Sequence, residues 1–313
     1  MPARPLVDYS LYVLVRLLIS CIQALPLDLI QSVSRYCAWL CWHVLRLRRP
    51  TVEENLQIAF PEKTQAERDR IALAMWQHLV LMVAEIAHAP RKLHRTNWRE
   101  HCRAPRMVEL IRLLLSERPT VLISGHLGNF ELGGYVLGLL GFATHTIARP
   151  LDNRYLDRFI NEFRGSTGQY MLSKTGSGQQ IALLLKQGGT LALLGDQHAG
   201  AGACWVEFFG RPASTHKAVA VFTLSGHATT VTCGMLRTGK PLQFEMRPEE
   251  IIDPLAEGFQ LGSIPQLAHW YTACLERLVR AAPEQYWWVH RRWKGEAVDR
   301  RAQRRMLRQS RAA

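Results

Sequence analysis

Residues 120–131 read Thr-Val-Leu-Ile-Ser-Gly-His-Leu-Gly-Asn-Phe-Glu and join an apolar run to a polar turn. The uncharged run at 120–124 contains β-branched residues and predicts a buried strand. Two glycines allow the following turn to bend, and Asn129 is a favoured cap for a helix that begins beside it. The segment therefore predicts strand, turn and helix, with His126 in the turn and Glu131 in the first helical turn.

Other short apolar runs alternate with helical patterns along the chain after residue 119. The runs predicted to be strands are 120–124, 143–148, 190–194, 228–236 and 242–247. The patterns predicted to be helices are 130–140, 155–164, 178–186, 217–224 and 264–281. This alternation predicts an α/β fold with a sheet flanked by helices.

The chain before this region is helical in character, and its apolar positions fall into two parts. Residues 64–89 have apolar side chains at three- and four-residue spacing, which predicts a long amphipathic helix. We expect N-terminal helices at 1–50, one main domain at 51–295 and a basic tail at 296–313. Within the main domain, a helical part at 51–118 precedes the α/β core at 119–295.

The segment 11–47 is strongly apolar but is interrupted by Arg16, Pro26, Asp28 and Arg35. It has no uninterrupted apolar run of about 18 residues, and it has no cleavage pattern of a signal peptide. Its leucines recur at helical spacing, and its aromatic residues are of the type that prefers membrane interfaces. We expect one or two helices that lie in, or dip into, a membrane; the alternative is a buried helical hairpin of a soluble protein.

Composition narrows the class of protein further. Hydrophobic residues make up 48% of the 313 positions and charged residues 21%, which indicates a folded core rather than a disordered chain. The net charge of +13 favours anionic partners such as phospholipid headgroups. The seven cysteines show no paired spacing, so we expect neither a disulfide framework nor a metal site.

His126 and Glu131 are the candidate catalytic pair. If the carboxylate folds back onto the imidazole, it orients the ring and stabilises the imidazolium form. Such a base could deprotonate a hydroxyl for attack on a thioester without a covalent enzyme intermediate. The chain has no Gly-x-Ser-x-Gly elbow that would supply a nucleophilic serine instead.

Polar residues also follow two other predicted strands. Arg149 comes after the run at 143–148, and Asp196 comes after the run at 190–194. Because ligands bind at the carboxyl ends of strands in open α/β sheets, these residues and His126 are expected to share one cleft. The alternative is that Arg149 and Asp196 are surface turn residues.

Several separated blocks of the chain resemble the lipid A biosynthesis late acyltransferases, the lauroyl and myristoyl transferase family. The blocks are Asn55-Leu56 with Phe60-Pro61, 125–131, Arg149-Pro150 with Asn153, Asp196, and Pro283-Glu-Gln-Tyr-Trp-Trp-Val-His-Arg-Arg-Trp-Lys294. The resemblance covers nearly the whole chain, and the last block is highly specific. The chain departs from the family pattern at His198, where a second acidic residue is common, and at Thr215-His216, where a threonine pair is common.

The resemblance implies a glycerolipid-acyltransferase-like fold, with 51–295 as the acyltransferase domain. It implies catalytic roles for His126, Glu131, Arg149 and Asp196. We expect substrate binding by Gly125, Asn129, Asn153 and Arg164, with no cofactor and no metal. The departures from the family pattern bear on the identity of the acceptor more than on the type of reaction.

The expected function is transfer of a fatty acyl group from an acyl thioester to a lipid-linked hydroxyl, most simply on a lipid A precursor. The expected partners are acyl carrier protein or acyl-coenzyme A, a lipid acceptor and an anionic membrane surface, and the expected location is the cytoplasmic face of the inner membrane. Nucleic acid is not an expected partner, because no nucleic-acid module accompanies the basic, tryptophan-rich ending. The alternatives are acylation of another glycolipid or lysolipid, hydrolysis of the thioester, and a catalytically silent membrane-surface protein.

Overall fold

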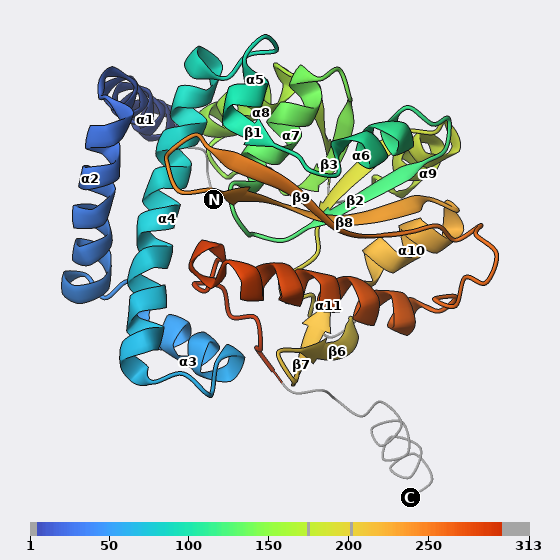
Figure 1. Ribbon diagram of the computed structural model, residues 1–313. Helices are drawn as coiled ribbons and strands as arrows, with labels where there is room; N and C mark the ends of the chain where they lie inside the picture. The colour runs from blue at the N-terminus through green and yellow to red at the C-terminus, as the bar shows by residue number, and fades with distance from the viewer. Residues whose placement is uncertain (1–4, 174–175, 201–202, 296–313) are drawn as a thin grey trace, which may run out of the picture.

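The computed structural model describes residues 5–173, 176–200 and 203–295, and its centre is a seven-stranded sheet (Figure 1). The strand order is β1-β9-β8-β2-β5-β3-β4. The strands of this sheet are β1 (Cys102–Arg103), β2 (Thr120–Ser124), β3 (Thr144–Ala148), β4 (Gln169–Ser173), β5 (Thr190–Leu194), β8 (Thr229–Arg237) and β9 (Phe244–Ile252). Neighbouring strands are parallel except β8 and β9, which are antiparallel. The predicted α/β class is confirmed.

The runs predicted at 120–124 and 190–194 are strands over those same residues, β2 and β5. The other three predicted runs are β3, β8 and β9, with β9 beginning later and extending further than expected. Sequence patterns missed the short β1, the edge strand β4 and a separate antiparallel hairpin of β6 (Cys204–Phe208) and β7 (Arg211–Thr215). These strands mix polar with apolar residues, so they lack the continuous apolar run that marked the central strands.

Helices cover both faces of the sheet (Figure 1). The helices of the α/β part are α6 (Met107–Leu114), α7 (Phe130–Leu139), α8 (Arg154–Gly165), α9 (Gly178–Lys186), α10 (Lys217–Ser225), α11 (Ile264–Ala281) and the short 3-10 helix η2 (Pro283–Gln285). Side chains of α6 and α7 share one hydrophobic core with one face of the sheet, whereas α9, α10 and α11 share the other core with the opposite face.

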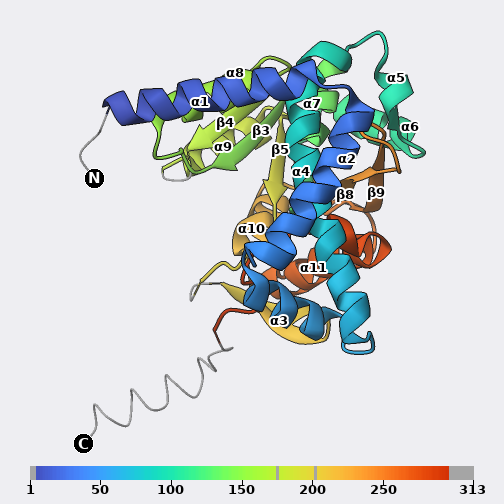
Figure 2. The ribbon, with the colours of Figure 1, turned by 90° about the vertical axis from the view of Figure 1, so that its left-hand side faces the viewer.

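A helical N-terminal region stands beside the sheet (Figures 1 and 2). Its elements are α1 (Pro5–Ala24), α2 (Leu27–Trp39), the π-helix η1 (Leu40–Val44), α3 (Arg49–Ala59), α4 (Gln65–Lys92) and α5 (Trp98–His101). The predicted amphipathic helix is α4, and Thr64 and Glu67 cap its start by exchanging hydrogen bonds. Helix α2 packs along α4, and α1 packs on both α4 and α8.

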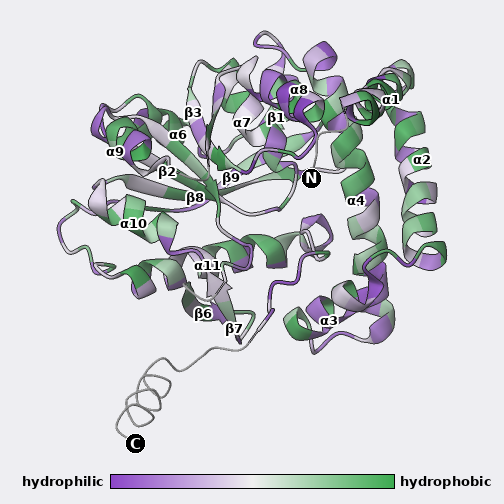
Figure 3. Cartoon of the chain, turned by 180° about the vertical axis from the view of Figure 1, so that it is seen from behind, coloured by the Kyte–Doolittle hydropathy of each residue, from purple (hydrophilic) through white to green (hydrophobic). Residues whose placement is uncertain are grey.

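Helix α1 has no buried residue, and apolar colours run along it (Figure 3). Of the helices that the structure describes, α1 and α4 are long and apolar enough to cross a membrane, but half of the α4 segment is buried within the protein. Helix α2 buries Ile30, Ser34 and Ala38. The alternative of a buried helical hairpin is therefore wrong for α1, and the predicted basic tail at 296–313 lies outside the described residues.

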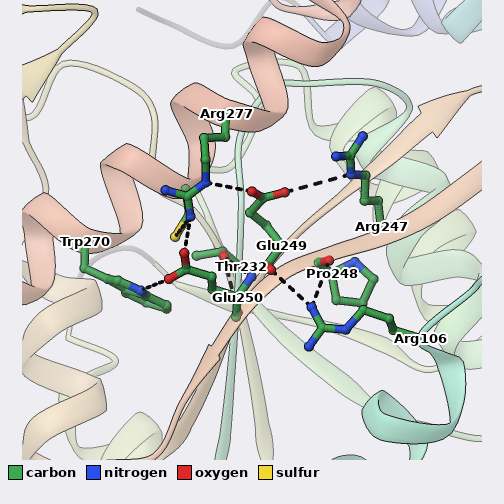
Figure 4. A network of polar contacts seen from close by, with 9 residues as sticks. Arg106, Thr232, Arg247, Pro248, Glu249, Glu250, Trp270 and Arg277 are labelled. Carbon is green, nitrogen blue, oxygen red and sulfur yellow. Dashed lines mark hydrogen bonds and ion pairs between the residues drawn. The ribbon is translucent and has the colours of Figure 1, made fainter. Parts of the chain in front are cut away.

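A polar network ties the antiparallel strand β9 to the helices on either side (Figure 4). Arg277 of α11 forms ion pairs with Glu249 and Glu250, and Trp270 donates its indole N–H to Glu250. On the opposite side, Arg106 donates to the backbone carbonyl of Glu249 at 3.1 Å. These contacts are partly exposed, so we assign them to the orientation of β9 rather than to a large share of stability.

Candidate active site

The turn at 125–129 joins the buried strand β2 to helix α7, as the sequence predicts. Asn129 caps α7 by accepting from the backbone N–H of Leu132 at 3.3 Å. Gly128 has a φ of +61°, and a Cβ at this position would lie 1.9 Å from the carbonyl oxygen of Met235. Only glycine fits there. The turn is thus held against β8, and His126 stands at the carboxyl end of β2.

The imidazole of His126 is held by Asp196, which follows the neighbouring strand β5. The Nδ1 of His126 lies 2.9 Å from the Oδ1 of Asp196, and the backbone N–H of His126 donates to Oδ2 at 2.8 Å. A carboxylate accepts, so Nδ1 carries the proton and Nε2 is the unprotonated nitrogen. The His126 side chain is 13% exposed and Asp196 is 3% exposed, which leaves an oriented histidine at the surface of the site.

The electrostatic surroundings keep Asp196 ionised. Burial alone would raise the pKa of its carboxyl group, but the contacts with His126 and the cation of Arg292 lower that pKa below its ordinary value. Tyr286 lies against the same carboxylate, and burial together with Asp196 raises the pKa of its phenol well above the ordinary range. Asp196 therefore remains the negative partner of His126 near neutral pH.

The predicted contact between Glu131 and His126 is wrong. Glu131 instead forms a two-pronged ion pair with Arg164 of α8, with the Arg164 Nε 2.9 Å from Oε2 and Nη2 2.5 Å from Oε1. The Glu131 side chain extends to the adjacent helix rather than back to the turn, because α8 places the Arg164 guanidinium beside it. Both side chains are less than one-fifth exposed, so the pair is largely shielded from water.

Aromatic rings and an amide enclose the imidazole. Trp287 stacks on His126 with ring centroids 4.8 Å apart and an interplanar angle of 10°, and its backbone N–H donates to the carbonyl oxygen of His126. Phe130 contacts the imidazole edge-on at 4.9 Å. The amide nitrogen of Gln197 lies 3.2 Å from the His126 Nε2, where it can donate to the unprotonated nitrogen. Gln197 thus lies against the Nε2 of His126 and lines the same cavity.

A cavity of about 750 Å³ opens beside this group. The polar residues that line it include Ser124, His126, Glu131, Arg149, Arg164, Gln197 and His216. Arg149 is 77% exposed at the mouth, where its contact is Asp152 at 3.4 Å. Asp196 contacts His126 directly, so the structure brings Asp196, His126 and Arg149 to the same region, as the strand-end pattern predicts. Glu131 also lines the cavity.

Three residues expected to bind substrate have structural positions instead. Asn129 is fully buried, and its amide donates to Glu85 at 3.0 Å. Asn153 caps α8 and donates to the backbone carbonyl of Asp8 in α1. Gly125 allows close packing, because a Cβ there would lie 3.2 Å from the Asp196 carboxyl carbon. Of the four residues in this group, Arg164 is the one that lines the cavity.

A buried polar network contacts the turn at Gly128 and Asn129. Glu85 of α4 is 0% exposed and accepts from the Asn129 amide and the Arg237 guanidinium. Arg237 donates to the Nδ1 of His78, whose Nε2 donates to the carbonyl oxygen of Gly128 at 3.2 Å. Burial, and then the nearby Arg237 cation, lower the pKa of His78 well below its ordinary value. His78 is therefore neutral and links α4 to the turn.

The tryptophan-rich ending contributes three groups whose roles the sequence left open. Trp287 stacks on the catalytic candidate, whereas Trp288 is buried against the hydrophobic core. Arg292 is 2% exposed and donates to the Ser214 carbonyl oxygen and the Thr215 hydroxyl. The positive charge of Arg292 lowers the pKa of Asp196. In the sequence, the high density of aromatic and basic residues at 286–293 indicates that this segment is important, but it does not predict which residues each of them contacts.

Comparisons with known proteins identify relatives of the chain. The chain is 26% identical over 260 residues to a lipid A biosynthesis palmitoleoyltransferase of Escherichia coli (strain K12), covering 81% of each chain. It is 25% identical over 293 residues to a lipid A biosynthesis lauroyltransferase of the same organism, covering 86% of this chain and 87% of the relative. The family model described as bacterial lipid A biosynthesis acyltransferase matches residues 3–295. The chain is an acyltransferase and belongs to the bacterial lipid A biosynthesis acyltransferase family.

Proposed function

We propose that the protein transfers a fatty acyl group from an acyl thioester to a hydroxyl of a lipid A precursor, with His126 as the general base. The observation that carries this proposal is the buried Asp196 carboxylate on the Nδ1 of His126, which directs the basic Nε2 toward Gln197 and the cavity. A histidine held in this way can accept a proton from a hydroxyl that replaces the Gln197 contact.

The reaction then needs no covalent enzyme intermediate. His126 Nε2 removes the hydroxyl proton of the acceptor as its oxygen attacks the thioester carbonyl carbon, and Asp196 stabilises the imidazolium. The new C–O bond forms, the C–S bond breaks, and the leaving thiolate takes the proton from His126. The acyl group is thereby transferred to oxygen, and the free thiol of the donor is released.

The cations at the mouth suit a negatively charged substrate. Arg149 is exposed and Arg164 is held in place by Glu131, so both guanidinium groups can bind an oxyanion or a phosphate group near His126. In this proposal Glu131 acts through Arg164 and not through the imidazole. Its removal would still lower activity, because Arg164 would lose the partner that fixes its orientation.

The acyl donor is an acyl carrier protein or an acyl-coenzyme A, and the protein acts at the cytoplasmic face of the inner membrane. The exposed apolar helix α1 and the net charge of +13 support contact with an anionic bilayer. In the proposed division of the chain, residues 1–50 provide the membrane-associated helices and residues 51–295 the acyltransferase domain, with 296–313 as a basic tail. The helices at the start of the chain bring the cavity close to lipid.

Mass spectrometry of products provides the direct test. The purified protein is mixed with acyl carrier protein or coenzyme A thioesters and, in separate assays, a lipid A precursor or a lysophospholipid, and the lipid products and free acid are measured separately. We expect acylated lipid from the wild type and a loss of about 10²–10⁴-fold for His126→Ala. Free acid as the main product would favour thioester hydrolysis instead. Exclusive acylation of a lysophospholipid would reassign the acceptor.

A further inference from the structure

The cavity beside His126 continues along the α7 face of the sheet. Leu122, Thr146, Met171 and Ala192 lie side by side in the strand register, so their side chains share this face, and all four line the cavity. We call the space lined by Leu122, Gly133, Leu137, Thr146, Ala192 and Met235 the α7 chamber. These residues belong to α7 and to the strands β2, β3, β5 and β8.

The α7 chamber has the chemistry of a hydrocarbon site. None of its six lining residues is charged, and the hydroxyl of Thr146 is satisfied by the Ala192 carbonyl oxygen at 2.9 Å. Cys233 also lines the cavity, and burial raises the pKa of its thiol to about 12, so it carries no charge at neutral pH. The buried side chains of Leu110 and Met246 stand among the lining residues from α6 and β9. A linear apolar chain fits this environment, and a sugar or phosphate does not.

Two adjacent glycines of α7 line the cavity, and they differ in what an added side chain would contact. A Cβ at Gly134 would lie 2.7 Å from the end of the Gln169 side chain, so a larger residue there would require this side chain to move. A Cβ at Gly133 would meet Met235 Cβ at 3.7 Å, which is an ordinary contact. Gly133 is also without a positive φ. Neither packing nor backbone conformation requires this glycine, although a helical glycine costs about 0.5–1 kcal/mol relative to alanine.

We infer that the acyl chain of the donor lies in the α7 chamber, and that Gly133 sets the longest chain that the enzyme accepts. Because Gly133 has no side chain, space is left there for a ligand, and neither the packing nor the backbone conformation of the protein requires glycine at this position. This inference rests on the proposed function, because a chain in the α7 chamber places its thioester end beside His126. Added bulk at position 133 then shortens the space available to the acyl chain.

The opposite side of the cavity provides a matched control. Ala218 of α10 also lines the cavity, but its helix belongs to the core on the other face of the sheet. Ala218→Leu therefore adds apolar bulk to the same cavity outside the α7 chamber. If the donor chain lies under α7, this variant leaves the order of preference among donor chain lengths unchanged, whatever it does to acceptor affinity.

The experiment measures kcat/KM of the full-length protein for a series of saturated acyl thioesters from about 8 to about 18 carbons. Gly133→Leu should lower kcat/KM for the longest accepted chain about 10-fold or more, with a smaller loss for shorter chains. Gly133→Ala should shift the optimum in the same direction by less, and thermal unfolding checks that each variant is folded.

Two outcomes would overturn the inference while leaving the proposed function intact. One is an active wild type whose chain-length profile is unchanged in both folded Gly133 variants. The other is a shift caused by Ala218→Leu that equals the shift caused by Gly133→Leu, which would place the donor chain on the other face. Absence of acyl transfer by the wild type with every donor and acceptor would instead contradict the proposed function itself.

Discussion

The carboxylate of Asp196 accepts two hydrogen bonds from one residue, His126, through the imidazole Nδ1 and the backbone N–H. The two residues are 70 positions apart in the chain. They meet because β2 and β5 are parallel neighbours with Ser124 opposite Leu194, and each residue lies two positions beyond the end of its strand. Asp196 therefore fixes both the ring and the turn that carries it.

Asp196→Asn should remove this arrangement with almost no change in volume. The two N–H groups of His126 donate to different oxygens of Asp196, so in the amide one of them would face an NH₂ group that is itself a donor. We expect kcat to fall by about 10²–10⁴-fold, because the imidazole loses its orienting charge. Steady-state kinetics checks this, with Asp152→Asn at the exposed mouth as the control. Near-normal turnover by folded Asp196→Asn would contradict the proposed role.

The Glu131–Arg164 pair can be tested by exchange of the two residues. Glu131→Gln or Arg164→Gln should lower stability by about 1–3 kcal/mol, since each leaves a shielded charge without its partner. The double variant Glu131→Arg with Arg164→Glu should recover part of that loss, as measured by chemical unfolding. It should not recover acyl transfer, because the cation would then stand on α7 rather than on α8. Recovery of activity together with stability would mean that the pair has only a structural role.

The neutral His78 should make the fold sensitive to mild acid. The folded protein holds the pKa of His78 well below its ordinary value of 6.5, whereas the unfolded chain takes up a proton near that value. The unfolded state therefore binds more protons below about pH 6.5, and stability falls as the pH decreases, by at most about 1.4 kcal/mol per pH unit for this group. Above that pH the contribution of His78 is constant.

His78→Gln removes the titrating group but keeps a donor for Gly128 and an acceptor for Arg237. Urea unfolding of both proteins between about pH 7.5 and 5 compares the two slopes. The wild type should lose more stability than the variant over this interval. Equal slopes would show that His78 is not held neutral in the folded state.

Removal of the N-terminal helices should affect both membrane binding and turnover. Full-length protein should remain on anionic vesicles at high salt, because apolar insertion of α1 is not screened. A protein that begins at Pro50 should be released, since it retains only the basic surface, at roughly 1 kcal/mol per well-placed Lys or Arg. Flotation at low and high salt measures this difference. Equal retention of the two proteins at high salt would contradict α1 as the anchor.

The same truncation should also lower activity on dispersed substrate. Asn153 at the start of α8 donates to the Asp8 carbonyl oxygen, and Tyr155 of α8 contacts Tyr9 of α1. Helix α8 carries Arg164, so loss of α1 loosens a wall of the active site. Some turnover should remain, because His126 and Asp196 are held by other elements. Unchanged kcat and KM after truncation would show that α1 does not support α8.

The sequence by itself determined the α/β class, the central strands β2 and β5, and the place of His126 in the turn after β2. These conclusions depend on local physics: uninterrupted apolar runs favour buried strands, and glycine with Asn129 favours a turn followed by a capped helix. The expectation that Asp196 lies near His126 also came from sequence, since carboxyl ends of parallel strands meet at one edge.

Only the tertiary structure decided which carboxylate holds the imidazole. Glu131 is nearer in sequence, but the direction of its side chain depends on α8, which supplies Arg164. Asp196 reaches His126 because β5 is the direct neighbour of β2, and strand order is not encoded in any single run of residues. The stacking of Trp287 likewise requires the C-terminal segment to return to the turn. Local patterns determine the elements, whereas contacts between distant side chains depend on how those elements pack.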